Sequence, residues 1–446
     1  MWGEDRLGIP VIRGQLLSIA ILSYSWADFH EPQKGHKAMP TIDGPRVVAD
    51  LKRLAEFGRY KTGVHRPTYS PVDVESRQWL AEKFREAGLD PVIDGIGNVI
   101  GCNPSAGRRL LVGSHSETQP YGGWLDGSLG VIYALELARA FAADPGCAGL
   151  GIEVAAWADE EGHYGNMLGS RSFTDALPED EIDRIRGRDD GTPLREALRR
   201  AGFAGRPRER VDPRHYVGYL EAHIEQGDTL DTTGLRIGVV ETIVGIWNYR
   251  VSVIGEQNHA GTTRMVRRKD AGVAMVRLAS RIHDRFPEIA GPRTVWTIGR
   301  MLIEPNAPSV IPGHAEMQVQ FRDADPERLA LFEKTLQELV GEARQAGPCH
   351  VEIEPIGRSE PRPMDPGFQA QIEAAAQRQA PGMHMRLPSA AGHDAAVLSY
   401  RMPAGMMFIP SLGGISHHWS EDSKEEDIVL GAQVFADAAE RILRAT

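Results

Sequence analysis

Three short apolar runs in this chain each end directly in histidine or carboxylate side chains. The runs and the polar residues that follow them are LLVGS at 110–114 before His115, EVAAW at 153–157 before DEEG at 159–162, and VGYLEA at 217–222 before His223. Runs of this length and composition predict buried strands. Ligands of open α/β sheets bind beyond the carboxyl ends of the strands. The sequence therefore predicts one site shared by three strand ends.

The pattern of helical and strand-like segments predicts two domains. From about residue 47 the two kinds of segment alternate, which is typical of an α/β sheet with crossover helices. In the middle of the chain the apolar residues of HAEMQVQFR alternate with polar ones, which predicts a half-exposed antiparallel sheet, and a helix is expected to begin at Asp325-Pro326. We therefore predict an α/β domain formed by residues 39–243 and 357–446, with a smaller α+β domain, residues 244–356, inserted between its parts.

Composition excludes several classes of function. The 446 residues include 50 Lys and Arg against 61 Asp and Glu, a formal net charge of −11, and no long basic block, so nucleic acid is not expected as a partner. Three widely spaced cysteines, Cys102, Cys147 and Cys349, exclude a disulfide scaffold and suit a reducing cytoplasm, which is the predicted location. The 15 histidines leave imidazole as the main candidate ligand.

The first 38 residues differ from the rest and are predicted to be a disordered extension. Their apolar run, LLSIAILSYSW at 16–26, is far too short to span a bilayer, so no membrane association is expected. A cleaved secretion signal is the alternative. Glu4 and Asp5 argue against it, because such signals begin with a basic segment.

Several residues at the predicted site have both a structural and a functional interpretation. Asp126 precedes Gly127 and, taken alone, is more typical of a helix N-cap than of a metal ligand. Glu160 and Glu161 are adjacent, so their side chains point in different directions, and one could bind a metal while the other faces a substrate. His417 adds a further imidazole near the C-terminus. Nitrogen and carboxylate ligands without thiolates suit zinc, manganese, cobalt or nickel.

The order of the motifs resembles that of the hydantoinase/carbamoylase branch of the M20 metallopeptidase family. The resemblance covers nearly everything from about residue 45 to the end. The motifs are GSHSETQPYGGWLDGSLG, DEEG, HIEQG, GEQNHAGTTRM, VIPG, GHDA and GISHHWSE. The resemblance implies a mixed-sheet, zinc-hydrolase-type catalytic domain with a smaller domain that serves as a lid and forms a homodimer.

The resemblance also implies a site for two divalent metal ions per subunit. His115 and His223 would bind one ion, Glu161 and His417 the other, with Asp126 bridging the two. Glu160 matches the position of the general base, which takes a proton from water and passes it to the leaving nitrogen. His259, in HAGTT, would donate to the oxyanion and would reach the site of the partner subunit.

The residues expected to contact the substrate depart in part from the family pattern. Glu117 stands where Asp is usual and is expected to orient the first metal histidine with a side chain one methylene longer. Ser309 replaces the usual Asn before VIPG, whereas Arg322 is kept and suits a carboxylate clamp; its alternative is an ion pair with Asp323. Two further expected contacts come from motif positions, Gln226 and His393, although His393 with Asp394 could also form only a structural turn.

The predicted function is hydrolysis of a linear carbon–nitrogen bond in a small molecule that carries a carboxylate. The first candidate substrate is an N-carbamoyl-L-amino acid, which would give the amino acid, carbon dioxide and ammonia. Alternatives are allantoate and an N-acyl amide, aryl amide or dipeptide, the last group suggested by Ser309, Trp124 and Trp419. A catalytically inactive binding protein on the same scaffold is the alternative outside the enzymes. The presence of every expected ligand and of the base argues against it.

Overall fold

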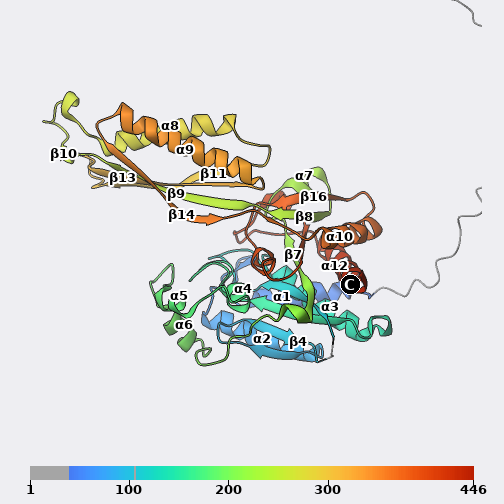
Figure 1. Ribbon diagram of the computed structural model, residues 1–446. Helices are drawn as coiled ribbons and strands as arrows, with labels where there is room; N and C mark the ends of the chain where they lie inside the picture. Colours follow the sequence, from blue (N-terminus) through green and yellow to red (C-terminus); the bar gives the residue numbers. More distant parts are fainter. Residues whose placement is uncertain (1–39, 105–106, 446) are drawn as a thin grey trace, which may run out of the picture. The chain divides into compact units, whose positions relative to one another are not determined.

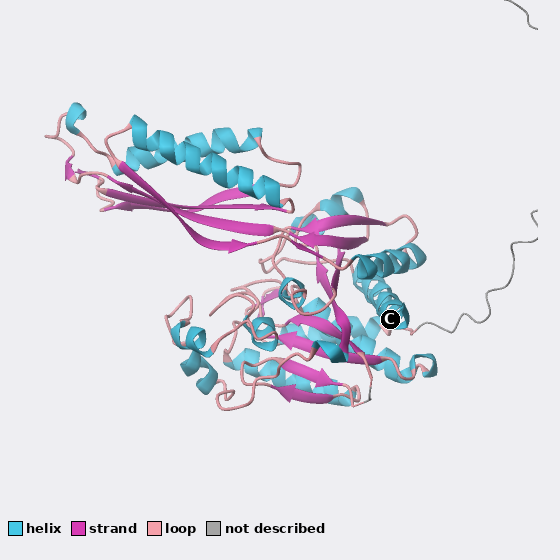
Figure 2. Cartoon of the chain, viewed as in Figure 1, coloured by secondary structure: helices cyan, strands magenta, loops and turns pink. Residues whose placement is uncertain are grey.

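The computed structural model describes residues 40–104 and 107–445, and the predictions for residues 1–38 lie outside this range (Figure 1). The described residues form a mixed α/β fold with two separate main sheets, as predicted (Figure 2). Among these residues, no helix has the length and apolar character needed to cross a membrane.

The larger sheet combines parallel and antiparallel pairs. Its strands, in spatial order, are β15 (Arg362–Pro363), β8 (Ile237–Ile243), β17 (Ala404–Ile409), β7 (Tyr216–Ile224), β5 (Arg109–His115), β6 (Gly151–Trp157), β4 (Val99–Cys102) and β3 (Asp90–Ile93), and β16 (His384–Ser389) also pairs with β8. β5 lies between β6 and β7 and is parallel to both. Because parallel strands end at the same edge of a sheet, the three predicted strand ends meet there.

Helices pack against this sheet and close its core. The longer ones are α1 (Gly44–Glu56), α2 (Pro71–Glu86), α3 (Ser128–Ala143), α10 (Pro366–Gln379) and α12 (Glu425–Ala445). α3 contacts β5, β6 and β7 on one side and α1 and α12 on the other. This burial on both sides explains why α3 is apolar almost all the way round. Shorter elements are α4 (Leu168–Phe173), α5 (Glu179–Arg184), α6 (Leu194–Arg200), α7 (Thr229–Thr233), α11 (Asp394–Leu398), β1 (Arg59–Tyr60) and β2 (Gly63–Val64).

The smaller sheet is antiparallel and carries its two helices on one face (Figure 1). Its strands, in spatial order, are β11 (Val295–Glu304), β13 (His314–Asp323), β9 (Gly245–Ile254) and β14 (His350–Ser359), and its helices are α8 (Ala271–Arg285) and α9 (Pro326–Ala346). Alternate residues of β13, from Ala315 to Phe321, are buried, which confirms the predicted period of two. Asp325 caps α9 as expected, accepting from the N–H of Glu327.

The smaller sheet and its helices have a hydrophobic cluster of their own, made only of side chains between residues 247 and 353. The exact domain boundaries at 244 and 356 stay a prediction. A two-stranded pair lies at one end of this unit, where β10 (Asn258–His259) runs antiparallel to β12 (Val310–Ile311) with His259 opposite Val310.

Candidate metal centre

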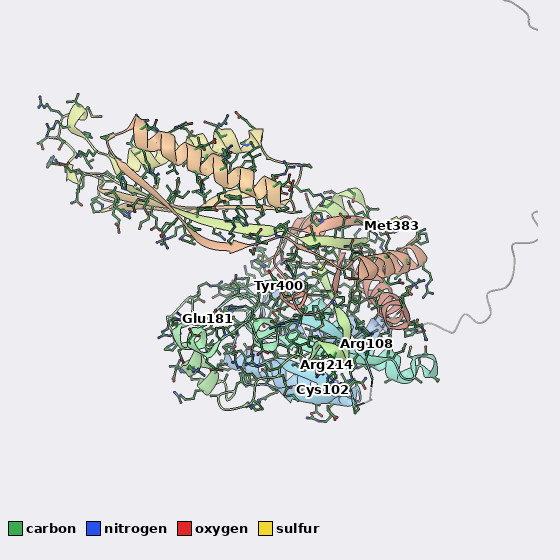
Figure 3. The ribbon with its side chains drawn as sticks, in the orientation of Figure 1. Cys102, Arg108, Glu181, Arg214, Met383 and Tyr400 are labelled. Atoms are coloured by element: carbon green, nitrogen blue, oxygen red, sulfur yellow. The ribbon has the colours of Figure 1, made fainter. Side chains whose placement is uncertain are left out.

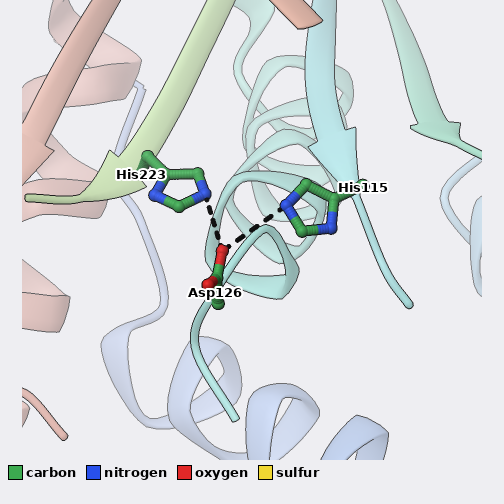
Figure 4. Close-up of side chains that lie close together, drawn as sticks. All are labelled: His115, Asp126 and His223. Carbon is green, nitrogen blue, oxygen red and sulfur yellow. Dashed lines mark ion pairs between the residues drawn. The ribbon is translucent and has the colours of Figure 1, made fainter. Parts of the chain in front are cut away.

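Two histidines and a carboxylate from three separate elements converge at the edge of the larger sheet. His115 ends β5, His223 is the penultimate residue of β7, and Asp126 lies just before α3. Asp126 Oδ1 is 3.5 Å from His115 Nε2 and 3.1 Å from His223 Nε2, and all three residues are buried (Figure 4). The N-cap interpretation of Asp126 is wrong, because the N-cap of α3 is Gly127 and no side chain caps the helix.

A second group shares the same carboxylate. Asp126 Oδ2 lies 3.3 Å from Nε2 of His417, and Glu161 Oε2 lies 3.7 Å from that nitrogen. The two oxygens of Asp126 therefore face different histidines. The ligand atoms of each group lie within 4.8 Å of one another, close enough to hold an ion. Imidazole and carboxylate donors of this kind fit zinc, manganese, cobalt or nickel.

Main-chain carbonyl groups fix the orientation of both buried histidine rings. Nδ1 of His115 is 3.1 Å from the carbonyl oxygen of Glu117, and Nδ1 of His223 is 2.9 Å from that of Ile224. A ring that donates from Nδ1 keeps its lone pair on Nε2, the atom that faces Asp126 in both cases. This is the tautomer that a metal ligand requires.

Glu117 acts differently from the expectation that its side chain orients His115. Its carbonyl oxygen, not its carboxylate, makes the close contact with the ring, since Oε1 is 3.8 Å from His115 Nδ1. The carboxylate accepts from the main-chain N–H of Glu160 at 2.7 Å and from Arg77 Nη2 at 2.8 Å. Glu117 therefore links the loop after β5 to the loop that carries Glu160.

The loop after β6 presents Glu160 and Glu161 because Asp159 organises it. Asp159 has φ of 58°, a conformation that Asp adopts more readily than most residues. Its buried carboxylate accepts from the N–H groups of His163, Tyr164 and Gly165 at 2.8–3.0 Å. The adjacent Glu160 lies with Oε2 3.6 Å from Nε2 of His115, on the wall of the same cavity as the candidate ligands.

The electrostatics of the cluster favour cations. Burial raises the pKa values of Glu160 and Glu161, and the carboxylates close to them act in the same direction. The hydrogen bond with Asp126 raises the pKa of His417 to about 9. Burial would also raise the pKa of Asp126, but contacts with three histidines outweigh it and hold that pKa well below its usual range. Divalent ions would relieve the repulsion among these carboxylates.

Two residues that sequence reasoning missed hold the ligands in place. Glu421 is buried and accepts from the N–H groups of Leu125 and Asp126 at 3.2 and 3.0 Å, and burial raises its pKa to about 8. It also accepts from Ser416 Oγ at 3.0 Å, and that hydroxyl lies 3.2 Å from Asp126 Oδ2. Both residues belong to GISHHWSE, so the motif was a signal, although nothing in it shows that they reach back to Asp126.

A cavity of about 1150 Å³ brings together the candidate metal residues and three of the expected substrate contacts, Gln226, Arg322 and His393. Gln226 donates to Asp126 Oδ2 at 2.9 Å. Arg322 donates to Gln320 Oε1 at 2.8 Å and to the carbonyl of Ala390 at 2.9 Å. Its alternative pairing with Asp323 is wrong, because the ion pair of that carboxylate is with Arg328.

His393 caps α11 at the cavity wall, and its ring packs against that of His223 with centroids 4.6 Å apart. His259 and Ser309 are not among the residues that line this cavity. Both are exposed, on the two-stranded pair and beside it, where the carbonyl of Ser309 accepts from the N–H of Ala260. Nδ1 of His259 accepts from the N–H of Gly261 at 3.0 Å, so a neutral ring carries its proton on Nε2.

Fold and site define a class of protein: α/β proteins with a His/carboxylate cluster, able to hold metal ions, at the ends of parallel strands. The model of peptidase family M20/M25/M40 matches residues 111–441, and the chain belongs to this family, in its hydantoinase/carbamoylase branch. A crystal structure of an amidase of that branch from Burkholderia phymatum is 45% identical, with a TM-score of 0.83 over 92% of this chain and 99% of the other.

Two relatives with assigned activities are amidohydrolases. N-carbamoyl-L-amino-acid amidohydrolase of Paenarthrobacter aurescens is 30% identical over 400 residues, 87% of this chain and 95% of that protein. Allantoate amidohydrolase of Escherichia coli is 31% identical over 397 residues, 87% of this chain and 96% of that protein. The family and the names of its members identify this chain as a hydrolase of carbon–nitrogen bonds other than peptide bonds.

Proposed function

We propose that this protein hydrolyses N-carbamoyl-L-amino acids to the amino acid, carbon dioxide and ammonia. The observation that carries the proposal is the pair of ligand groups that share Asp126, with Glu160 beside them in the same cavity. The names of the relatives support the choice of a ureido bond. The overall reaction consumes one water, whose oxygen ends in carbon dioxide and whose hydrogens end on the two nitrogens.

The ligand groups fit two divalent metal ions per subunit, zinc or alternatively manganese, cobalt or nickel. His115 and His223 would hold one, Glu161 and His417 the other, and Asp126 would bridge them. Such ions make a bound water acidic and polarise the carbonyl group of the substrate. Glu160 then accepts the proton of the water and donates it to the leaving nitrogen. A carboxyl group whose pKa burial has raised can hold that proton in between.

His259 is proposed to stabilise the oxyanion from the partner subunit of a homodimer. Two observations support this: its Nδ1 accepts from the N–H of Gly261, which leaves Nε2 to act as the donor, and in its own chain His259 lies outside the lining of the cavity. Residues 244–356 would then form both the dimer contact and a lid whose closure excludes water. Ser309 lies beside His259 and would reach the partner's substrate with it.

The substrate's carboxylate is proposed to bind Arg322, which lines the cavity and has no carboxylate partner among the described residues. A guanidinium group can bind a carboxylate through two parallel hydrogen bonds. Gln226 and His393 would complete this contact from the side of the candidate ligands.

Ammonia release from a panel of N-carbamoyl-L-amino acids by the metal-loaded protein tests the proposal. We expect turnover that falls about 10²- to 10⁴-fold in Glu160→Gln, the range that a general base contributes, while the metal content stays unchanged. Glu425→Gln is the matched control, because its carboxylate is 65% exposed and pairs with Lys52. No ammonia from any compound in the panel, with two ions bound, would contradict the proposal.

Allantoate is the second candidate substrate, favoured by the similarity to the Escherichia coli allantoate amidohydrolase. It carries the same kind of ureido bond, so product analysis by mass would distinguish the two candidates. The features that suggested an N-acyl amide or a dipeptide receive no support from the cavity, since neither Trp124 nor Trp419 lines it.

A further inference from the structure

The cavity extends beyond the candidate ligands along α11. His393, at the N-terminal end of this helix, contacts His223, whereas Tyr400 and Arg401 follow its C-terminal end, and all three line the cavity. α11 has five residues, Asp394–Leu398, so at 1.5 Å each its two ends are about 8 Å apart, and Tyr400 and Arg401 lie beyond its last residue. A compound that holds its ureido group at the ligands can therefore reach the far end only with an extended side chain.

Two arginines stand at that far end. Arg401 donates from Nε to the carbonyl of Thr174 at 2.9 Å, and Arg362 donates from Nε to Ser399 Oγ at 3.2 Å. The guanidinium carbon of Arg362 lies 3.5 Å from the ring centroid of Tyr400, which holds its plane in one orientation. Both arginines line the cavity, and their Nη groups make no hydrogen bond to the described part of the chain.

The distribution of charge leaves this end of the cavity positive. Within residues 40–104 and 107–445, no carboxylate lies within 4.0 Å of the guanidinium nitrogens of Arg362 or Arg401. The one other acid in the lining, besides those of the ligand cluster, is Glu360, which pairs with Arg358 at 3.2 Å. The carboxylates of the ligand cluster would be neutralised by metal ions. Nothing described at the far end balances the two arginines.

We propose that Arg362 and Arg401 bind a second anionic group of the substrate, so that the preferred substrates are N-carbamoyl derivatives of dicarboxylic L-amino acids. This rests on the proposed function and adds the class of side chain. The free Nη groups can donate to the two oxygens of one carboxylate, a geometry that lysine or a neutral donor does not match. A cavity of about 1150 Å³ also has room for a side chain of this length.

Kinetics with two isosteric substrates test this inference. We expect a higher kcat/KM for N-carbamoyl-L-glutamate than for N-carbamoyl-L-glutamine. Arg362→Gln and Arg401→Gln should each lower kcat/KM for N-carbamoyl-L-glutamate about tenfold or more, which is the usual effect of losing a hydrogen bond to a charged group. The same variants should change kcat/KM for N-carbamoyl-L-glutamine less than about twofold, because its side chain carries no charge. Arg214→Gln is the control, because it removes the same charge from an exposed pair with Asp212. Figure 3 labels Arg214 and also Tyr400, whose ring packs against Arg362.

Direct binding separates failure of this inference from failure of the proposed function. Calorimetry on the metal-loaded protein would compare glutarate with its monoamide, neither of which needs turnover. Tighter binding of glutarate that is lost in Arg401→Gln supports the anion site even if no ureido compound releases ammonia. Equal binding of the two acids, or an equal kcat/KM for the two substrates in the unaltered protein, overturns the inference and leaves the proposed hydrolysis intact.

Discussion

Asp126 is the residue on which the candidate centre depends most, because each of its oxygens faces a different ligand group. Its position is held by three kinds of contact: imidazole nitrogens, the amide of Gln226 and the hydroxyl of Ser416. Its main-chain N–H is fixed separately by Glu421. A carboxylate bound in this way has little freedom to move, which suits a ligand that must reach two ions at once.

Replacing Asp126 by Asn should therefore remove metal. The amide keeps the shape of the side chain but loses the negative charge that both ions would share. We therefore expect the affinity for at least one ion per subunit to fall more than about 100-fold, which is the upper end of the range for loss of a residue that only supports a ligand. Metal content after dialysis against buffered metal, measured by mass spectrometry, checks this. Asp180→Asn, at an exposed pair with Arg184, is the control and should keep its metal; two ions retained in Asp126→Asn would contradict the bridge.

The sequence indicated which residue types gather at the site, but not how each is held. His115 and His223 could be placed because each follows an apolar run, and the ends of parallel strands are neighbours in space. The local pattern of Asp126 favoured an N-cap, which is wrong, because a cap and a ligand have the same local pattern and the distant histidines that lie near Asp126 leave no signal in it. Glu421 could not be found because its partners, Leu125 and Asp126, lie almost 300 residues away in the chain.

At the scale of elements, α2 is joined to the site by a buried charge network. Arg77, on α2, donates to Asp73 at 2.9 Å and to Glu117 at 2.8 Å, and all three side chains are 0% exposed. Glu117 in turn binds the N–H of Glu160. The packing of this helix thus fixes the loop that carries the proposed base.

Arg77→Met should lower the free energy of unfolding by about 3–5 kcal/mol, because it leaves two buried carboxylates without their common cation. Denaturant unfolding of the metal-free protein measures the effect, and Arg85→Met on the same helix, whose exposed pair is with Glu82, is the control. A loss of less than about 1 kcal/mol would show that the network contributes little to stability.

The turn between β3 and β4 gives a pH-dependent contribution to stability. Burial raises the pKa of Asp94 to about 6, although the N–H groups of Ile96, Glu209 and Asn98 oppose the shift. Because an unfolded Asp has a pKa near 4, the folded chain keeps a proton between about pH 4 and 6 that the unfolded chain has lost. The free energy of unfolding contributed by Asp94 therefore falls as pH rises through this window, by roughly 3 kcal/mol in total.

Asp94→Asn removes this titration. The free energy of unfolding of the unaltered protein minus that of the variant should fall by roughly 3 kcal/mol between pH 4 and 6 and then stay level. Urea denaturation at several pH values measures this difference. Parallel stability curves for the two proteins would contradict the raised pKa.

Most elements could be predicted from periodicity, whereas their order in space could not. The alternation in β13 and the cap and apolar face of α9 follow from local patterns, and both agree with the structure. The insertion of β17 between β8 and its sequence neighbour β7, and the pairing of β16 with β8, depend on long-range pairing that leaves no local signal. The same holds for Arg362, whose place in the cavity follows from the pairing of β15 with β8.

At the scale of the whole molecule, the separation of His259 from the cavity of its own chain leads to the strongest test of the proposed homodimer. The cavity contains Glu160 but not His259, so a complete site would combine Glu160 of one subunit with the partner's His259. Two variants, Glu160→Gln and His259→Ala, would each be nearly inactive alone, because every site in either homodimer lacks one of the two groups.

Mixing the two variants under conditions that exchange subunits should restore activity. In a mixed dimer, the chain with His259→Ala still carries Glu160, and it receives an intact His259 from the chain with Glu160→Gln, so one of the two sites is complete. Because random exchange makes half of the dimers mixed, ammonia release should rise to about one quarter of that of the unaltered protein at equal concentration. If His259 acted within its own chain, every site would still lack one group, and mixing would restore nothing.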